Sequence, residues 1–195
     1  MASSNVSSFL QTIGQGVKPN MFLIDVQFPQ PIKLGTEDQN LTNILCKSAA
    51  LPGSNLGVIE VPFRGRTVKI AGDRTFDTWT TTFFNDKDFK LRAFFEQWAN
   101  SINTHEGNTA PLFTPDSTNG YMADLGVKQL EKDASEEGAI LRTYTLKYCF
   151  PTNVSAIDLA YDSNDQIEEF SVEWQYSYFT AEGGTKSGVS NVGVV

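Results

Sequence analysis

The stretch AGDRTFDTWTTTFFND, residues 71–86, opens with charged side chains of the kind that perform acid–base chemistry. Asp73 adjoins Arg74, and a carboxylate beside a guanidinium can hold a proton-transfer group in place. The following segment, 76–84, is mostly aromatic or β-branched and contains neither Gly nor Pro, which predicts a strand. We therefore expect Gly72 and Asp73 to form a turn that leads into a structural strand.

The residues that could act as bases or nucleophiles are few and far apart. The single histidine, His105, lies in the polar segment THEGNTAP, with no serine or cysteine motif near it, so a solvated loop histidine is favoured over a catalytic one. The two cysteines, Cys46 and Cys149, fall in strand-like segments rather than at a C-x-x-C spacing. We expect two buried free thiols in a reducing compartment, and no zinc site.

Other signatures of enzyme chemistry are also missing from the sequence. Neither of the glycine-rich phosphate-binding motifs, G-x-x-x-x-G-K-[ST] and G-x-G-x-x-G, occurs. Paired carboxylates at Asp86/Asp88, Glu136/Glu137 and Glu168/Glu169 fall in turns, at a helix start or at a strand edge, where solvated charge is the ordinary interpretation. We predict no catalytic, cofactor-binding or metal-binding residue, and a protein that is not an enzyme.

Charge is distributed unevenly along the chain. The 195 residues include 15 Lys+Arg and 23 Asp+Glu, a net charge of −8, which opposes tight binding to nucleic acid. Residues 47–92 carry eight basic and five acidic side chains, net +3, so the remainder carries −11. The basic cluster of this segment lacks interleaved stacking aromatics, which favours a protein contact over a DNA patch. Its members are Arg64, Arg66, Lys69 and Arg74.

Hydrophobic periodicity predicts a short helix, several long strands and one long helix. Residues 3–13 carry an apolar stripe at helical spacing, with Ser3 or Ser4 as cap. Residues 86–102 carry a second stripe, capped by Asn85 or Asp86, through Leu91, Phe94, Phe95 and Trp98. Strands are predicted at Met21–Phe28, Leu41–Ala50, a hairpin or arm around Gly65 after the connector 51–57, Phe76–Phe84, Met122–Glu131, Ile140–Phe150, Ser155–Tyr161 and 169–179.

These elements predict a mainly β fold, a sandwich or partly open barrel with one helix packed on it. We expect an N-terminal extension at 1–18, a β domain at 19–179 and a flexible Gly/Ser-rich tail at 180–195. Residues 100–120 are polar and rich in turn residues, which predicts a long surface loop. Neither a signal peptide nor a membrane-spanning run is visible, so an intracellular soluble protein is expected.

Four segments, in order, closely resemble the tail tube proteins of contractile-tailed, T-even-type bacteriophages. They are KPNMFLIDV, CKSAALPG, the segment from AGDRTFDTWTTTFFND through Trp98, and PTNVSAIDLAYDSNDQIEEFSVEWQYSYF. Residues 29–41, 100–120 and those past Phe179 depart from the family pattern. The resemblance implies two packed antiparallel sheets with a flanking helix, a fold shared with the type VI secretion tube protein.

The resemblance also implies a place in the virion tail, after assembly in the host cytoplasm. Hexameric rings would stack as a hollow tube around the tape measure protein and later pass DNA without binding it tightly. The expected partners are other copies of the chain, the tail sheath protein, and the baseplate and tail terminator proteins, with no membrane contact. Such a ring or stack needs heterologous contacts between copies.

We expect residues 52–72, from Pro52 onward, to form an arm between rings, with Arg64, Arg66 and Lys69 facing acidic groups of the next ring. The N-terminal helix should dock on a neighbour through Phe9 and Leu10. Asp73 and Arg74 should fix the turn before the strand or form a salt bridge between subunits. The candidates for an acidic, luminal surface are Glu168, Glu169 and Glu173.

One alternative is a tail terminator, baseplate adaptor or monomeric binding module on the same β-sandwich. Sizing chromatography and negative-stain microscopy distinguish it from a tube subunit, because only the latter stacks. A third hypothesis, an enzyme, lacks any residue constellation to test.

Overall fold

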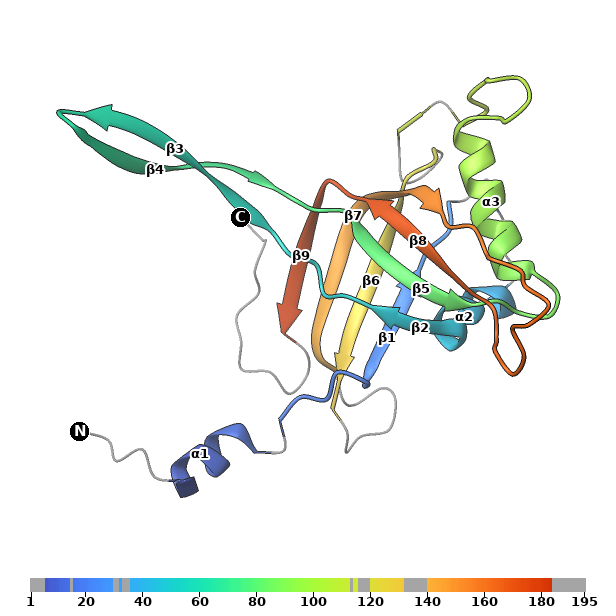
Figure 1. The fold of residues 1–195 in the computed structure, drawn as a ribbon, viewed down its shortest axis with the longest axis horizontal. Coiled ribbons are helices and arrows are strands. Elements are labelled where there is room, and N and C mark those ends of the chain that lie inside the picture. The colour runs from blue at the N-terminus through green and yellow to red at the C-terminus, as the bar shows by residue number, and fades with distance from the viewer. Residues whose placement is uncertain are drawn as a thin grey trace.

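The computed structural model describes residues 6–14, 16–29, 32, 36–112, 114–115, 120–131 and 140–183, with only the backbone of 36–39 (Figure 1). The predicted mainly β class is confirmed. The helices are α1 (Val6–Ile13), α2 (Thr36–Leu45) and α3 (Lys90–Ile102). The strands are β1 (Phe22–Val26), β2 (Cys46–Ala49), β3 (Asn55–Phe63), β4 (Arg66–Thr75), β5 (Trp79–Phe84), β6 (Ala123–Leu130), β7 (Ile140–Val154), β8 (Glu169–Gln175) and β9 (Tyr178–Gly183).

Seven of these strands form one antiparallel sheet that curls around a single core. Their order is β1-β6-β7-β8-β5-β2, and β9 pairs with β7 beside β8. Ile24 of β1 and Ala49 of β2 lie at the two ends of this order, yet both pack in the same hydrophobic cluster. Helix α2 lies against β1, where the Asn43 side chain accepts a hydrogen bond from the Ile24 N–H at 3.4 Å. The sheet is therefore a partly open barrel, as predicted.

Helix α3 covers the core with the apolar stripe expected from the sequence. Leu91, Phe95 and Trp98 are fully buried. Trp98 packs against Trp174 of β8 with ring centroids 5.3 Å apart, and its Nε1–H donates to the Tyr121 carbonyl at 2.7 Å. Large aromatic side chains can be buried here because their single polar group finds a partner.

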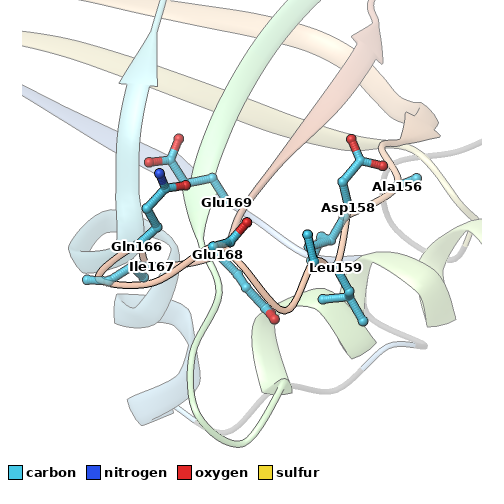
Figure 2. Close-up of a pocket in the computed structure, with 10 residues that line it drawn as sticks. Ala156, Asp158, Leu159, Gln166, Ile167, Glu168 and Glu169 are labelled. Carbon is cyan, nitrogen blue, oxygen red and sulfur yellow. The ribbon is translucent and has the colours of Figure 1, made fainter.

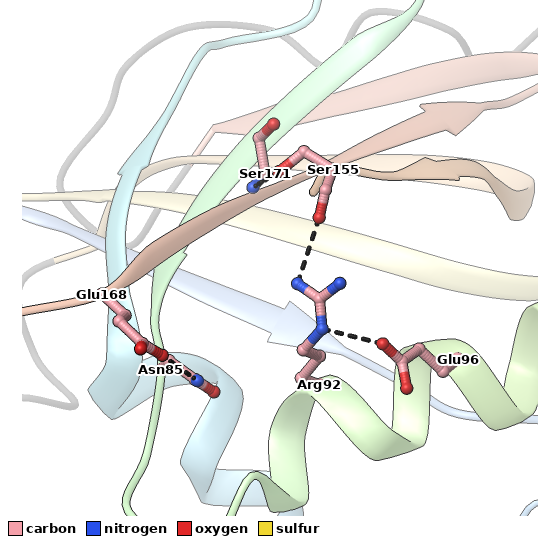
Figure 3. A network of polar contacts seen from close by, with 6 residues as sticks. All are labelled: Asn85, Arg92, Glu96, Ser155, Glu168 and Ser171. Atoms are coloured by element: carbon pink, nitrogen blue, oxygen red, sulfur yellow. Dashed lines mark hydrogen bonds and ion pairs between the residues drawn. The ribbon is translucent and has the colours of Figure 1, made fainter. Parts of the chain in front are cut away.

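Polar contacts hold α3 to the chain beyond β7 (Figure 3). The Arg92 guanidinium donates to the Ser155 carbonyl at 3.0 Å and pairs with Glu96 at 2.7 Å. The Ser155 hydroxyl in turn accepts from the Ser171 N–H of β8 at 2.8 Å. This chain of contacts fixes Ser155 beside β8, where β7 has already ended.

The start of α3 confirms the predicted cap and corrects the predicted boundary. The Asp86 carboxylate accepts from the N–H groups of Lys90 at 3.0 Å and Leu91 at 3.2 Å. The helix itself begins only at Lys90, because Phe89 has a left-handed φ of 55°. Asp86 therefore caps from outside the helix rather than as its first residue.

Two strand predictions were wrong in position, and a third strand ends later than predicted. Residues 41–45 belong to α2, and only Cys46–Ala49 form a strand. A short apolar run does not distinguish a helix from a strand, and contact with β1 decided this one. Ser155–Tyr161 form no strand, and β7 instead continues through Pro151, which pairs with Trp174.

The predicted alternation of β7 breaks at Tyr148. Leu146 and Cys149 are both fully buried, three positions apart, because Tyr148 adopts a left-handed φ of 59° and bulges out of the register with β6. The single strand predicted at 169–179 is interrupted at the same level, since β8 ends at Gln175 and β9 starts at Tyr178. The carboxylate pair Glu136/Glu137, the cap at Ser3 or Ser4 and the tail from 184 onward lie outside the described residues.

Candidate assembly surfaces

The predicted hairpin is a long two-stranded arm that projects from the barrel (Figure 1). Among the described strands, β3 and β4 pair only with each other, and their residues are exposed along almost the whole length. The tip is a two-residue turn in which Arg64 and Gly65 have φ of 46° and 79°. Positive φ at both positions matches the right-handed twist of the flanking strands.

The base of the arm corrects the predicted turn at Gly72 and Asp73. Both residues lie inside β4, at a register shift where β4 has an extra residue opposite Gly57. A Cβ on Gly72 would lie 3.2 Å from the Gly57 backbone, so the two strands cross closely here. Gly72 and Asp73 resemble a turn in the sequence because a β-bulge also favours small residues. The Asn55 amide donates to Asp77 at 2.6 Å and joins the two exits of the arm.

The predicted basic cluster lies along this arm. Lys69 pairs with Glu60 at 3.5 Å, and the Arg64 guanidinium lies 5.3 Å from the centroid of the Phe63 ring. Within the described part of the chain, Arg66 and Arg74 make no ion pair. The arm, residues 55–75, carries four basic and two acidic side chains, so its net charge is +2.

The predicted apolar stripe of α1 is fully exposed. Phe9 and Leu10 are 62% and 59% exposed, and none of the eight residues of α1 is buried. Figure 1 shows α1 apart from the barrel, at the end of the sheet opposite to the arm. A helix of this length is marginal alone, so a partner surface is needed to stabilise it.

The predicted acidic surface is partly neutralised within the chain. Glu169 pairs with Lys47 at 2.6 Å, and Glu168 accepts from the Asn85 amide at 2.8 Å. Glu173 lies on β8 and makes no side-chain contact of this kind to other described residues. Glu168 and Glu169 also border a surface hollow of about 600 Å³ formed by residues 156–169 (Figure 2).

The groups that could do chemistry remain apart in the fold. His105 is exposed, and its Nδ1 lies 2.9 Å from the Asn100 amide oxygen. Cys46 and Cys149 are free, and burial raises the pKa of each thiol to about 12, so neither is a thiolate nucleophile near neutral pH. Among the described residues no cluster of three His, Cys, Asp or Glu side chains could hold a metal ion.

One polar site was missed by sequence reasoning. The Asp124 carboxylate accepts from Lys147 Nζ at 2.6 Å and from the Tyr148 N–H at 3.4 Å. The bond to Asp124 raises the pKa of Lys147 above its ordinary value. Only the pairing of β6 with β7 brings these residues together, so nothing in their sequence spacing announces the site.

Comparison with known proteins assigns the chain to a family. The family model described as "Phage tail tube protein" matches residues 17–182. The chain belongs to the phage tail tube protein family. This tail tube protein is 34% identical over 166 residues to "Tail tube protein gp19" of Enterobacteria phage T4, covering 85% of the chain and 92% of the relative.

Solved structures share the fold of this tail tube protein. A chain of the PVC extracellular contractile injection system, in its sheath-tube complex in the extended state, aligns with a TM-score of 0.59 and 15% identity over 93% of this chain and 100% of the other. A chain of the anti-feeding prophage baseplate aligns with a TM-score of 0.59 and 14% identity, over 84% and 93% respectively. At such identities the likeness shows the fold alone.

The family confirms the predicted resemblance. The tail tube protein is a structural component of a contractile virion tail, and it is not an enzyme. Of the helices in the described ranges, none is both long and apolar enough to span a bilayer.

Proposed function

We propose that this tail tube protein assembles into hexameric rings that stack as the inner tube of the tail. The tube encloses the tape measure protein and conducts DNA. The observation that carries the proposal is the projecting arm, because it exposes apolar side chains that no other described residue covers. An isolated two-stranded ribbon is marginally stable in water, so an arm of this kind needs a neighbouring surface.

The exposed apolar side chains of the arm are large and numerous. They are 41–62% exposed, and burial of apolar surface contributes roughly 25 cal/mol per Å². A contact with another copy would therefore stabilise the arm and the assembly together. The residues are Leu56, Val58, Ile59, Val61, Phe63, Val68 and Ile70.

Charge supports a head-to-tail contact between copies. The net charge of the arm is +2 and that of the whole chain is −8, so the residues outside the arm have a net charge of −10. We propose that Arg64 and Arg66 face acidic groups of the next ring, and that Arg74 and Asp73 add contacts at the arm base. Pro52 lies in the segment that leads to the arm. Such a heterologous contact can repeat along an axis, as a stack requires.

The outer face of four strands supports the passage of DNA. Asp25, Gly126, Thr145 and Thr180 form one row across β1, β6, β7 and β9, on the side away from the core. This row is small and polar. The adjacent rows of the same face add Lys128 and Lys147 but also Asp124 and Glu182, so with Asp25 the face has three carboxylates against two amines and would not hold phosphates tightly. We propose it as the luminal face.

The acidic residues of β8 and of the segment just before it are a second candidate for the luminal face. We propose Glu173 as its principal charge, because Lys47 and Asn85 already engage Glu169 and Glu168. For the outer partners we propose the sheath, baseplate and tail terminator proteins. The fold neighbours from a sheath-tube complex and a baseplate support this assignment.

Reversal of the charge at the arm tip tests the proposal. In R64E/R66E we expect roughly tenfold fewer stacked tubes by negative-stain microscopy, because the tip would repel the acidic neighbour. The circular dichroism spectrum should stay that of the wild type, since both side chains are exposed. The matched control K87E/K90E makes the same charge change at the start of α3 and should stack normally.

Normal tubes from R64E/R66E would contradict the assignment of the arm. A wild-type protein that persists as a 21.5 kDa species would contradict the tube itself and favour a monomeric binding module. Wild-type rings that never stack would favour a tail terminator or baseplate adaptor.

A further inference from the structure

We propose that the apolar face of the arm docks on helix α1 of a neighbouring copy. The proposal rests on the proposed self-assembly and specifies which two surfaces meet. It starts from the register of β3 and β4, because residues directly opposite each other in an antiparallel pair point to the same side of the ribbon.

The register gives the arm two unlike faces. Ile59 opposes Ile70 and Val61 opposes Val68, so one face is a continuous apolar stripe that ends at Phe63. The other face carries the Glu60–Lys69 ion pair, and beside it Pro62 opposes Thr67. Only the first face is suited to burial against an apolar surface.

Helix α1 presents the complementary surface. Val6, Phe9, Leu10 and Ile13 follow one side of the helix, and all four are exposed. The helix contains no charged residue, so no charge on it would be left unpaired when its apolar side is buried against the arm.

The two surfaces match in length and in charge. Eight helical residues span about 12 Å, and the strand from Ile59 to Phe63 spans about 13 Å. Helix α1 has no basic residue in its last turn, while Arg66 lies opposite Phe63 at the tip of the apolar face. If the C-terminal end of α1 lies at the arm tip, its free carbonyl groups would lie beside this arginine. A cation is favourable at that end of a helix.

The positions of the two surfaces favour a contact between copies over one within a chain. Figure 1 shows the arm and α1 leaving the barrel at opposite ends of the sheet. Copies stacked in the same orientation therefore bring the arm of one toward the α1 end of the next. Each copy would give one arm and receive one, which is the geometry of an open, repeating stack.

Disulfide trapping tests the pairing directly. Tubes are assembled from a mixture of L10C chains and V61C chains, each in a Cys46→Ala background, and oxidised mildly. We expect a covalent heterodimer on a non-reducing gel. The matched control replaces V61C with T67C, on the polar face of the arm, and should give at least tenfold less heterodimer.

The outcomes separate this inference from the proposed function. Tubes that form without preferential L10C–V61C linkage would overturn the docking and leave the tube subunit intact. Absence of any assembly in the wild type would overturn both. As an independent readout, F9D/L10D should abolish stacking, whereas S8D/Q11D on the opposite side of α1 should preserve it, and equal behaviour of the two variants would also overturn the docking.

Discussion

Tyr148 is the residue at which the sheet changes direction. Its φ of 59° is unusual for a bulky aromatic side chain, and left-handed backbone costs roughly 1–2 kcal/mol. Asp124 stabilises this conformation because it accepts from the Tyr148 N–H and from Lys147. One carboxylate therefore holds the bulge that lets β7 pair first with β9 and then with β8.

Substitution of that carboxylate should weaken the bulge. We expect D124N to lower the free energy of unfolding of the monomer by about 1 kcal/mol at pH 7, since a charged hydrogen bond is lost at a partly buried site. The bond raises the pKa of Lys147, so its contribution is complete below the ordinary lysine value of 10.5 and fades as pH rises above it. Urea unfolding at pH 7 and above pH 11 measures both effects.

Asp25 provides the control for the substitution of Asp124. It lies on the same outer face, and its side chain has no hydrogen bond or ion pair to the other described residues. D25N should leave the free energy of unfolding unchanged. An equal loss in D25N and D124N would show that the bulge does not depend on Asp124.

At the scale of elements, α3 illustrates how a local signal becomes a stable unit. Its apolar stripe was readable from the sequence because helical spacing repeats over several turns. Its first turn depends on Asp86, whose two acceptor bonds satisfy N–H groups that no helical carbonyl can reach.

Removal of this cap should destabilise the barrel through α3. We expect D86A to cost about 1 kcal/mol in the free energy of unfolding, measured by urea titration of the monomer. D88A is the control, because Asp88 has the same charge near the same helix end but accepts no such bond. A loss in D88A as large as in D86A would attribute the effect to the helix dipole alone.

Elements with a strong local pattern were predictable, and those set by distant contacts were not. The arm was visible from β-rich runs on both sides of Gly65, and α1 from its stripe. Helix α2 was missed because its short apolar run is ambiguous until β1 lies beside it. The bulge at Tyr148 was missed because it arises from pairing with β6, and the bulge at Gly72 looked like a turn.

At the scale of the whole molecule, the uneven charge decides how the protein meets DNA. A net charge of −8 repels phosphates, and the arm is the basic exception within an acidic chain. The same arm is proposed to be buried between rings, so assembly would leave little positive charge for DNA to reach.

The assembled protein should therefore not retain DNA. We expect no binding of duplex DNA at about 150 mM salt and about 10 µM protein, measured by fluorescence anisotropy. Any weak binding by unassembled protein near ~50 mM salt should vanish in R64E/R66E and persist in K87E/K90E. Salt-resistant binding by assembled tubes would contradict the proposed luminal face.

The close crossing at the base of the arm also determines how force enters the barrel. The arm continues into β2 on one side and β5 on the other, and the Trp79 indole donates to the Ala50 carbonyl at 2.6 Å between these two exits. Tension on the arm thus pulls both strands together, along their own axes. Ladder hydrogen bonds run perpendicular to the strands, so those between β5 and β8 would be sheared at once instead of peeled in turn. When a tail contracts around such a subunit, the resulting tension would load the sheet along its strands, the direction in which it resists force best.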